Sequence, residues 1–313
     1  MKIVFFGSSD FSLASLKALR QKHQLLAVYT QPDRKKGRNL LLSKTPVKIY
    51  AEEYNLPIFQ PEIVSAPEIV EQLKSFNADL FVVVSFGQKL SNQLLEIPRE
   101  FCLNVHSSLL PKWRGAAPIN YAIINGDKLS GVTIMKMNET MDGGDIVLSK
   151  SLEINDDDAV VLLDKLAVLG AEALLESIDL IEKNQEKFVP QDQSKVSVAK
   201  KLKKENGLID WRDSADCIHN KVRGLLPWPC AFTHYKGKLL KILKTKVLAF
   251  DRLENTAQIP GEIVQIEKHA GIVVMTGSQA LLIESLQLEG KKAMNAYDFV
   301  NGHNLKGGDI FGN

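Results

Sequence analysis

The segment that most constrains the fold is residues 80–84 (LFVVV), because all of its consecutive side chains are apolar. A strand that is apolar on both faces has to be covered on both faces, which is the environment of a central strand in a parallel sheet. Shorter apolar runs at 3–6, 25–29 and 102–105 alternate with segments of helical spacing. This alternation predicts an α/β fold with a doubly wound, mostly parallel sheet.

The sequence also predicts where the helices begin and where an antiparallel pair of strands lies. We expect Asp10 to cap the first helix and Thr45, which is followed by proline, to cap the second. Residues 156–182 have a long helical periodicity. Residues 132–137 alternate apolar and polar side chains, and 146–154 follow after a glycine turn. These two segments are therefore predicted to form an antiparallel pair of strands.

The composition and periodicity of the sequence change after about residue 186. Residues 187–205 are polar and lysine-rich without periodicity, which predicts a linker after a first domain over 1–186. Residues 206–313 contain short strand-like runs separated by Gly, Pro and Lys, a pattern typical of a small C-terminal β-barrel of OB type. Trp211 and Trp228 lie among prolines and apolar residues, so we expect both to pack into the core of this second domain.

Bulk composition limits the class of protein. The chain has 313 residues, 45% of them hydrophobic, with no apolar run long enough to span a membrane and no signal peptide at the first residues. Its cysteines, Cys102, Cys217 and Cys230, form no CxxC pair, which indicates reduced thiols in the cytoplasm. The six histidines show no metal-ligand spacing. We therefore expect a cytoplasmic monomer with no metal.

Charge is distributed unevenly along the chain. The net charge is +2 overall, but residues 1–190 carry −3 and residues 191–313 carry +5. A basic C-terminal half is typical of proteins that bind a polyanion such as nucleic acid. A solvated lysine surface has the same composition, so charge alone leaves both interpretations open.

One set of side chains could form a single polar pocket. Asn104 and His106 are two positions apart, so a strand that ends near them directs both side chains to the same face. An amide donor beside an imidazole suits a carbonyl whose oxygen is gaining negative charge. A carboxylate can orient and charge that imidazole. Asp142 and Asp145, on either side of a glycine pair, are the candidates for this carboxylate.

Together these residues resemble a known family. The chain contains, in order, Asn104-Val105-His106, Ser108-Leu109-Leu110-Pro111 and Asp142-Gly143-Gly144. In this order and spacing the segments are similar to the folate-dependent formyltransferases. The resemblance implies that Asn104, His106 and Asp142 are catalytic, because the family places its acid before the glycines.

The same resemblance implies a site for 10-formyltetrahydrofolate. One part would follow His106, where Pro111 fixes the loop and leucines offer apolar surface to a flat ring. The other part would follow the 80–84 strand, where the backbone would bind the pterin edge. The implied folate-binding residues are Ser108, Leu109, Leu110, Pro111, Phe86, Gly87, Gln88 and Leu90.

Further segments are similar to the branch of the family that acts on methionyl-tRNA. They are residues 7–11, 30–34, 209–211, 227–229 and 290–294. The resemblance implies formyl transfer to the α-amino group of methionine on initiator methionyl-tRNA, a step of translation initiation. The resemblance makes Arg34, Arg38 and Lys44 candidates for binding tRNA, and the crowding of lysines at 236–246 adds Lys238 and Lys241 as candidates for contact with its backbone. The chain departs from this branch at Ser8-Ser9, where Thr-Pro is common, and at Ser107, where a smaller residue is usual.

Several alternatives stay open. An N-formyltransferase that acts on an amino-sugar nucleotide would share the Asn-His-Asp site and a C-terminal barrel. A glycinamide-ribonucleotide formyltransferase would not need the C-terminal domain, and a formyltetrahydrofolate hydrolase would carry a different regulatory domain. A tRNA- or dinucleotide-binding module would use the polar residues structurally, although residues 7–12 (GSSDFS) lack the glycine pattern of a dinucleotide fingerprint.

Overall fold

The computed structural model describes residues 1–36, 41–248 and 259–312, and the chain forms two compact units. Unit 1 consists of Met1–Pro118, Leu129–Glu153 and Leu163–Ala199. Unit 2 consists of Ile119–Lys128, Ile154–Leu162 and Lys200–Asn313. Residues 187–199, which fall within the predicted linker, therefore belong to unit 1.

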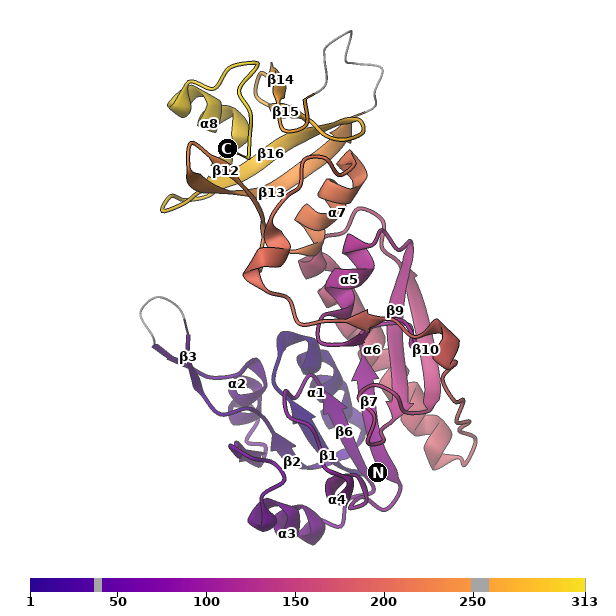
Figure 1. Cartoon of the computed structure of the whole chain (residues 1–313). Coiled ribbons are helices and arrows are strands. Elements are labelled where there is room, and N and C mark those ends of the chain that lie inside the picture. The colour runs from indigo at the N-terminus through magenta and orange to yellow at the C-terminus, as the bar shows by residue number, and fades with distance from the viewer. Residues whose placement is uncertain (37–40, 249–258, 313) are drawn as a thin grey trace. The chain divides into compact units, whose positions relative to one another are not determined.

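Unit 1 is built on a seven-stranded sheet (Figure 1). Its parallel strands, in spatial order, are β7 (Phe101–His106), β6 (Leu80–Val84), β1 (Lys2–Gly7), β2 (Gln24–Tyr29) and β5 (Ile58–Phe59). Beyond β7 the sheet continues with two antiparallel strands, β9 (Leu129–Lys136) and β10 (Ile146–Glu153). The predicted mostly parallel sheet with an antiparallel pair is confirmed.

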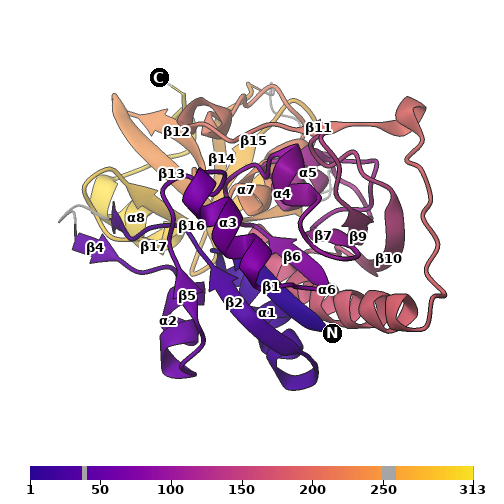
Figure 2. The ribbon, with the colours of Figure 1, turned by 90° about the horizontal axis from the view of Figure 1, so that it is seen from below.

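Helices cover both faces of this sheet, as the fully apolar strand β6 requires. They are α1 (Asp10–Lys22), α3 (Pro67–Ser75), α4 (Asn92–Leu95) and α6 (Ala159–Glu182). On one face, Phe81 of β6 shares a core with Leu73 of α3 and Leu94 of α4. On the other, Gly170 of α6 lies close to Val105 of β7. Figure 2 shows α3 on one side of the strands and α1 with α6 on the other.

The helix starts follow local capping chemistry. At α2 (Pro46–Glu53), the Thr45 hydroxyl accepts a hydrogen bond of 3.0 Å from the Lys48 N–H, as predicted. The prediction for Asp10 is wrong by one residue, because Ser9 is the N-cap of α1 and Asp10 is the first helical residue. A carboxylate in the first turn still stabilises the positive end of the helix dipole.

The strand order creates a ligand-binding edge. β1 pairs with β2 on one side and with β6 on the other, so the order of connection reverses next to β1. Open α/β sheets bind ligands at such a reversal, outside the C-terminal ends of the strands. In unit 1 this edge contains the ends of β1, β6 and β7, at Gly7, Val84 and His106.

Unit 2 contains an antiparallel sheet. Its strands, in spatial order, are β12 (Ala231–Tyr235), β13 (Lys238–Leu248), β16 (Ala280–Leu288), β15 (Gly271–Met275) and β14 (Ile263–Glu267), with β17 (Met294–Asn295) paired to β16. Helices α7 (Ala215–Gly224) and α8 (Ala296–His303) contribute to its apolar core. This arrangement is consistent with the predicted small barrel.

Short elements complete the two units. They are β8 (Arg114–Gly115), β11 (Val198–Ala199), α5 (Pro118–Ile124) and the 3₁₀ turns Gln193–Lys195 and Lys204–Gly207. Within the described ranges, no helix is long and apolar enough to cross a membrane. No group of three or more His, Cys, Asp or Glu side chains in that part of the chain could hold a metal ion.

The tryptophans of unit 2 lie in different environments. Trp211 is 6% exposed, and its indole N–H donates a 3.1 Å hydrogen bond to the Thr233 hydroxyl, so its predicted place in the core is confirmed. The same prediction is wrong for Trp228, which is 51% exposed. Apolar neighbours in the sequence do not determine which way a loop side chain points, because that depends on contacts with distant residues.

Candidate active site

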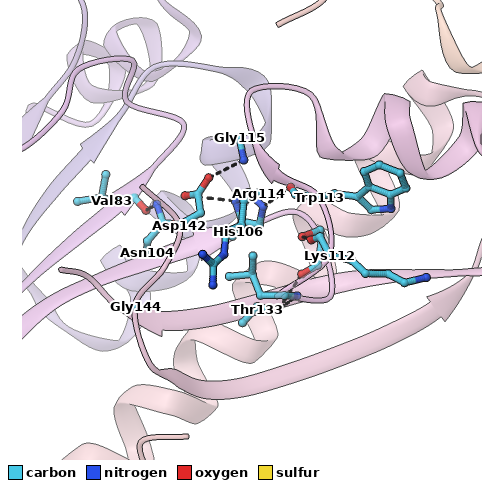
Figure 3. Close-up of polar contacts among 12 residues, drawn as sticks. Val83, Asn104, His106, Lys112, Trp113, Arg114, Gly115, Thr133, Asp142 and Gly144 are labelled. Atoms are coloured by element: carbon cyan, nitrogen blue, oxygen red, sulfur yellow. Dashed lines mark hydrogen bonds and ion pairs between the residues drawn. The ribbon is translucent and has the colours of Figure 1, made fainter. Parts of the chain in front are cut away.

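The C-terminal edge of the unit 1 sheet contains a cavity of about 570 Å³. Asn104, His106 and Asp142 all line it, so the structure brings together the residues that the sequence singled out (Figure 3). Apolar side chains also contribute to the wall, among them Phe86, Leu90, Met135 and Met137. A largely apolar wall with a few convergent polar groups is typical of a small-molecule site.

His106, the last residue of β7, has a defined tautomer. Its Nε2 atom lies 3.0 Å from the carbonyl oxygen of Trp113. Because a carbonyl oxygen can only accept a hydrogen bond, Nε2 must carry a proton, and Nδ1 of the neutral ring is then unprotonated. Nδ1 lies 3.6 Å from Oδ1 of Asp142. The carboxylate therefore faces the ring nitrogen that can gain a proton.

Asp142 is held in place through its backbone turn and its second oxygen. Its φ of 50° lies in the left-handed region, which is unusual for a residue other than glycine. Its Oδ2 atom accepts a hydrogen bond of 2.8 Å from the Gly115 N–H. At Gly144 a Cβ atom would collide with the Lys136 carbonyl oxygen, so the turn after Asp142 requires glycine there.

The competing carboxylate, Asp145, is not part of the cavity wall. Its carbonyl oxygen instead accepts a 2.9 Å hydrogen bond from the N–H of Lys136, the last residue of β9. Of the two acids beside the glycine pair, Asp142 is the one that faces His106 (Figure 3).

Asn104 retains free hydrogen-bonding capacity at the cavity. Its Nδ2 donates a 3.0 Å hydrogen bond to the carbonyl oxygen of Val83 on β6, which uses one of its two amide protons. Its Oδ1 is buried and has no hydrogen-bond partner among the described residues. A buried acceptor without a partner is rare in folded proteins and indicates a place for a polar ligand.

The 86–90 loop lines the same cavity through the residues predicted for folate: Phe86, Gly87, Gln88 and Leu90. The Gln88 side chain is engaged with another loop, because it accepts a hydrogen bond from the Val64 N–H at 2.8 Å and donates to the Pro61 carbonyl at 3.1 Å. The Ser8 hydroxyl donates to the Phe86 carbonyl at 3.0 Å. Gln88 and Ser8 thus fix the loop backbone, and the family departure at Ser8 keeps a hydroxyl there.

The other predicted folate segment does not contribute to the lining of the cavity; it consists of Ser108, Leu109, Leu110 and Pro111. The Ser108 hydroxyl donates to the Lys112 carbonyl at 2.6 Å. The Thr133 hydroxyl donates to the Ser108 carbonyl at 2.7 Å and accepts from the Leu110 N–H at 3.1 Å. These bonds shape the loop that leads from His106 to Trp113. Contact of this segment with folate stays a prediction.

The strands β3 (Arg34–Lys36) and β4 (Leu41–Ser43) pair antiparallel and form a β3–β4 hairpin; Arg34 begins β3 and Lys44 directly follows β4. The side chains of Arg34 and Lys44 form exposed ion pairs of 2.7 and 2.6 Å with glutamates. Such surface pairs contribute about 0–1 kcal/mol, so they do not prevent either cation from binding another anion. Arg38 lies outside the described residues.

The base of this hairpin is anchored more firmly. Hydrogen bonds from the Lys48 ammonium and the Gln60 amide lower the pKa of the Asp33 carboxyl. Lys48 and Asp33 lie 2.7 Å apart, and both side chains are mostly buried. Asp33 therefore remains ionised and holds the residues next to Arg34.

The predicted C-terminal tRNA-binding residues lie on β13 in unit 2. Lys238 is exposed at the start of this strand, and Lys241 is half-buried opposite Phe232 of β12. Leu240 and Ile242 of the same strand are buried in the core. The alternation turns Lys241 away from that core, where it is accessible to an anion.

Sequence reasoning missed the residues that hold the predicted catalytic side chains. Trp113 binds His106, and Gly115 binds Asp142. Gln191 and Ser197, from the predicted linker, bind the loops that carry Asp142 and Trp113. Gly115, with a φ of 117°, leaves a weak signal in the sequence, since glycine permits such a backbone. No periodicity or motif marks Gln191 and Ser197.

Comparison with known proteins identifies the family. The model of the formyl transferase family matches residues 1–178, and that of the formyl transferase C-terminal domain matches residues 201–304. A methionyl-tRNA formyltransferase of Geobacter metallireducens is 45% identical over 310 residues, which cover 98% of this chain and 97% of that protein. A methionyl-tRNA formyltransferase of Alkaliphilus oremlandii is 41% identical over 314 residues and covers 100% of both chains.

Solved structures share the fold at low sequence identity. WlaRD, a sugar 3N-formyl transferase, has a TM-score of 0.65 at 19% identity, over 93% of this chain and 99% of WlaRD. HypX from Aquifex aeolicus, in complex with tetrahydrofolic acid, has a TM-score of 0.61 at 16% identity over 96% of this chain. The match covers 47% of HypX, so this chain spans about half the length of that protein. From the two family models and the full-length relatives together, the chain belongs to the formyl transferase family and, within it, to the methionyl-tRNA formyltransferases.

Proposed function

We propose that this enzyme transfers the formyl group of 10-formyltetrahydrofolate to the α-amino group of methionine on initiator methionyl-tRNA, for translation initiation. The observation that carries the proposal is the convergence of Asn104, His106 and Asp142 on one cavity. The name shared by the full-length relatives supports methionyl-tRNA as the acceptor.

The cavity fits the folate donor in size and chemistry. Its volume of about 570 Å³ lies in the usual range for small-molecule sites. Phe86 and Leu90 supply apolar surface for a flat ring, and the unpaired Oδ1 of Asn104 supplies a polar contact. When bound, the folate supplies the formyl carbon and the leaving nitrogen.

The reaction makes specific demands on the protein. Attack of a neutral amine on the formyl carbon moves the carbonyl electron pair onto the formyl oxygen and leaves the attacking nitrogen positive. When the carbonyl re-forms, the bond between carbon and folate nitrogen breaks and its electron pair stays on that nitrogen. The attacking nitrogen loses one proton, and the folate nitrogen gains one. The site therefore needs a donor for the oxygen and a group that exchanges protons.

His106 and Asp142 meet the demand for proton exchange. Because Nε2 of His106 is committed to the Trp113 carbonyl, any proton that the ring gains or loses is at Nδ1. The Asp142 carboxylate, whose Oδ1 lies 3.6 Å from Nδ1, can stabilise positive charge that develops on the ring during the transfer. A protonated Nδ1 can donate a charge-assisted hydrogen bond to the formyl oxygen or pass its proton to the folate nitrogen.

Asn104 meets the demand for a neutral donor. Its bond to the Val83 carbonyl fixes the amide plane, and the second amide proton can be donated to the formyl oxygen. Loss of one such donor typically costs about 10²–10³ in rate. Its unpaired Oδ1 can accept a hydrogen bond from an N–H of the attacking amine, which orients the nitrogen lone pair towards the formyl carbon.

Contacts with tRNA complete the proposal. Arg34, Arg38 and Lys44 of the N-terminal loop and Lys238 and Lys241 of β13 would bind the phosphate backbone or exposed bases. Charge and family resemblance support these assignments. We also infer that the enzyme acts in the cytoplasm as a monomer.

The testing experiment is a formyl-transfer assay with 10-formyltetrahydrofolate and two acceptors, methionine-charged initiator tRNA and an amino-sugar nucleotide. We expect formylmethionine on the tRNA and no formylated sugar. A His106→Ala variant, folded by circular dichroism, serves as the control for background transfer. Formylated sugar with unreacted tRNA would overturn the acceptor assignment and establish the amino-sugar alternative.

A further inference from the structure

The Gln191 side chain lies between two loops of the active site and uses its whole hydrogen-bonding capacity. Its Oε1 atom accepts bonds of 3.0 and 2.7 Å from Nε and Nη2 of Arg114. Its Nε2 atom donates bonds of 2.9 and 2.7 Å to the carbonyl oxygens of Asp142 and Gly144. An amide offers two donors and two acceptor positions, so all of them are occupied. Gln191 is 7% exposed, which strengthens these bonds by excluding water.

The two loops carry the two halves of the catalytic pair. Arg114 lies between Trp113, whose carbonyl oxygen binds His106, and Gly115, whose N–H binds the Asp142 carboxylate. The other loop carries Asp142 itself. Gln191 therefore links the backbone that orients His106 to the backbone that presents Asp142.

The same segment supports the first loop at two further points. The Ser197 hydroxyl accepts a 2.9 Å hydrogen bond from the Trp113 N–H, and the Ser197 carbonyl accepts one of 2.9 Å from the Arg114 N–H. β11 then pairs in parallel with β8. Residues 187–199 thus run along the site with a set of specific bonds, although their composition is that of a linker.

We propose that Gln191 is a positioning residue that sets the separation between His106 and Asp142. The inference rests on the catalytic roles proposed above for these two residues. Asp142 has a left-handed backbone, with φ of 50°, a conformation that is less favourable for aspartate than for glycine and that bonds to the surrounding structure help to hold. Gln191 supplies two of those bonds, to the carbonyl oxygens on both sides of Gly143.

Two variants separate positioning from mere support of the fold. Gln191→Glu keeps the size and the acceptor for Arg114, but a carboxylate cannot donate to the Asp142 and Gly144 carbonyls and repels them. Gln191→Asn keeps the amide but is one methylene shorter, so it cannot reach both loops. The matched control is Gln185→Glu, at an exposed glutamine two residues before the segment 187–199. Each variant is assayed for kcat, KM for methionyl-tRNA, folate binding and thermal unfolding.

We expect kcat to fall about 10- to 100-fold in both Gln191 variants. Folate binding and the KM for methionyl-tRNA should stay near the wild-type values, and the control should match wild type. Because Gln191 would act through Asp142, its effect should largely disappear in an Asp142→Asn background, measured as single-turnover rates with excess enzyme. A simple supporting role would instead give multiplicative losses.

Wild-type kcat in the Gln191→Asn variant, or independent losses in the double variant, would overturn the positioning role while leaving the formyl transfer intact. If Gln191→Glu fails to fold, Gln191→Asn decides the question alone. A wild-type enzyme that formylates neither acceptor would overturn the proposed function itself, so the two failures are distinguishable.

Discussion

The carbonyl oxygen of Trp113 lies 3.0 Å from Nε2 of His106, and this bond determines which ring nitrogen faces the cavity. The backbone of Trp113 is in the left-handed region, with φ of 59°, and this conformation directs the carbonyl towards the imidazole. A bulky residue adopts such a backbone at a cost of about 1–2 kcal/mol. The orientation of His106 thus depends on a backbone conformation rather than on a neighbouring side chain.

Substitutions at Trp113 test this dependence. Asparagine tolerates the left-handed region, whereas valine is strongly disfavoured there because its β-carbon is branched. Both variants lose the indole, so the comparison isolates the backbone. We expect kcat of Trp113→Val to be about 5- to 30-fold lower than that of Trp113→Asn, as a cost of 1–2 kcal/mol implies. The test is steady-state kinetics of both variants. Equal kcat values would contradict the proposed dependence of the His106 orientation on the backbone of Trp113.

Removal of the Asp142 charge should slow the chemical step. Asp142→Asn keeps an oxygen that can accept from the Gly115 N–H but no longer stabilises positive charge that develops on the His106 ring. We expect kcat to fall about 10²–10³-fold with folate binding nearly unchanged. Asp145→Asn, outside the cavity wall, is the control and should retain activity. Near-normal turnover of Asp142→Asn in a single-turnover assay would exclude this role.

The lysines of β13 should contribute through charge alone. Each contact with a tRNA phosphate adds roughly one to the slope of log Kd against log salt concentration. We therefore expect Lys238→Ala and Lys241→Ala each to reduce that slope by about one and to leave kcat at saturating tRNA unchanged. Lys74→Ala, an exposed lysine of α3 paired with Glu71, should have no effect. The measurement is a tRNA-binding titration at several salt concentrations, and slopes equal to the control would remove both residues from the interface.

The three thiols should differ in reactivity because thiolate is the reactive form. Cys217 is exposed, whereas burial raises the pKa of the Cys102 thiol. Burial also raises the pKa of Cys230, opposed by the nearby positive charge of Lys241. We expect an alkylating reagent to modify Cys217 rapidly in the native enzyme and Cys102 only after unfolding. Mass spectrometry of the modified peptides provides the test. Rapid labelling of Cys102 in the native enzyme would contradict the prediction, because it would mean that the core around Cys102 opens readily.

The same burial has a consequence for stability at high pH. An unfolded thiol ionises near pH 8.5, while native Cys102 keeps its proton because its pKa is raised. The unfolded state then binds fewer protons than the native state, so the free energy of unfolding decreases as pH rises above that value. Urea unfolding of Cys102→Ala should show a smaller decrease over this range than the wild type.

Much of unit 1 follows from local sequence. The apolar run of β6 requires burial on both faces, and Thr45 with Pro46 starts α2 through a bond to a residue three positions away. Asn104 and His106 share a face because strand side chains alternate. Such features depend on neighbours within a few residues, so they can be predicted from the sequence without a structure.

The support of the site depends on contacts between distant parts of the chain. Gln191 binds Arg114 across 77 positions and Asp142 across 49, and no local pattern distinguishes it from a linker glutamine. Trp211, between two charged residues, is buried, whereas Trp228, between two prolines, is exposed, and contacts with distant residues decide both. By itself the sequence determined most of the strands and the start of α2, because these follow from backbone periodicity and local hydrogen bonds, and its family motif singled out Asn104, His106 and Asp142. Only the tertiary structure decided which nitrogen of His106 is free and what holds Asp142 opposite it, because a hydrogen bond between distant segments exists only after packing brings its donor and acceptor together.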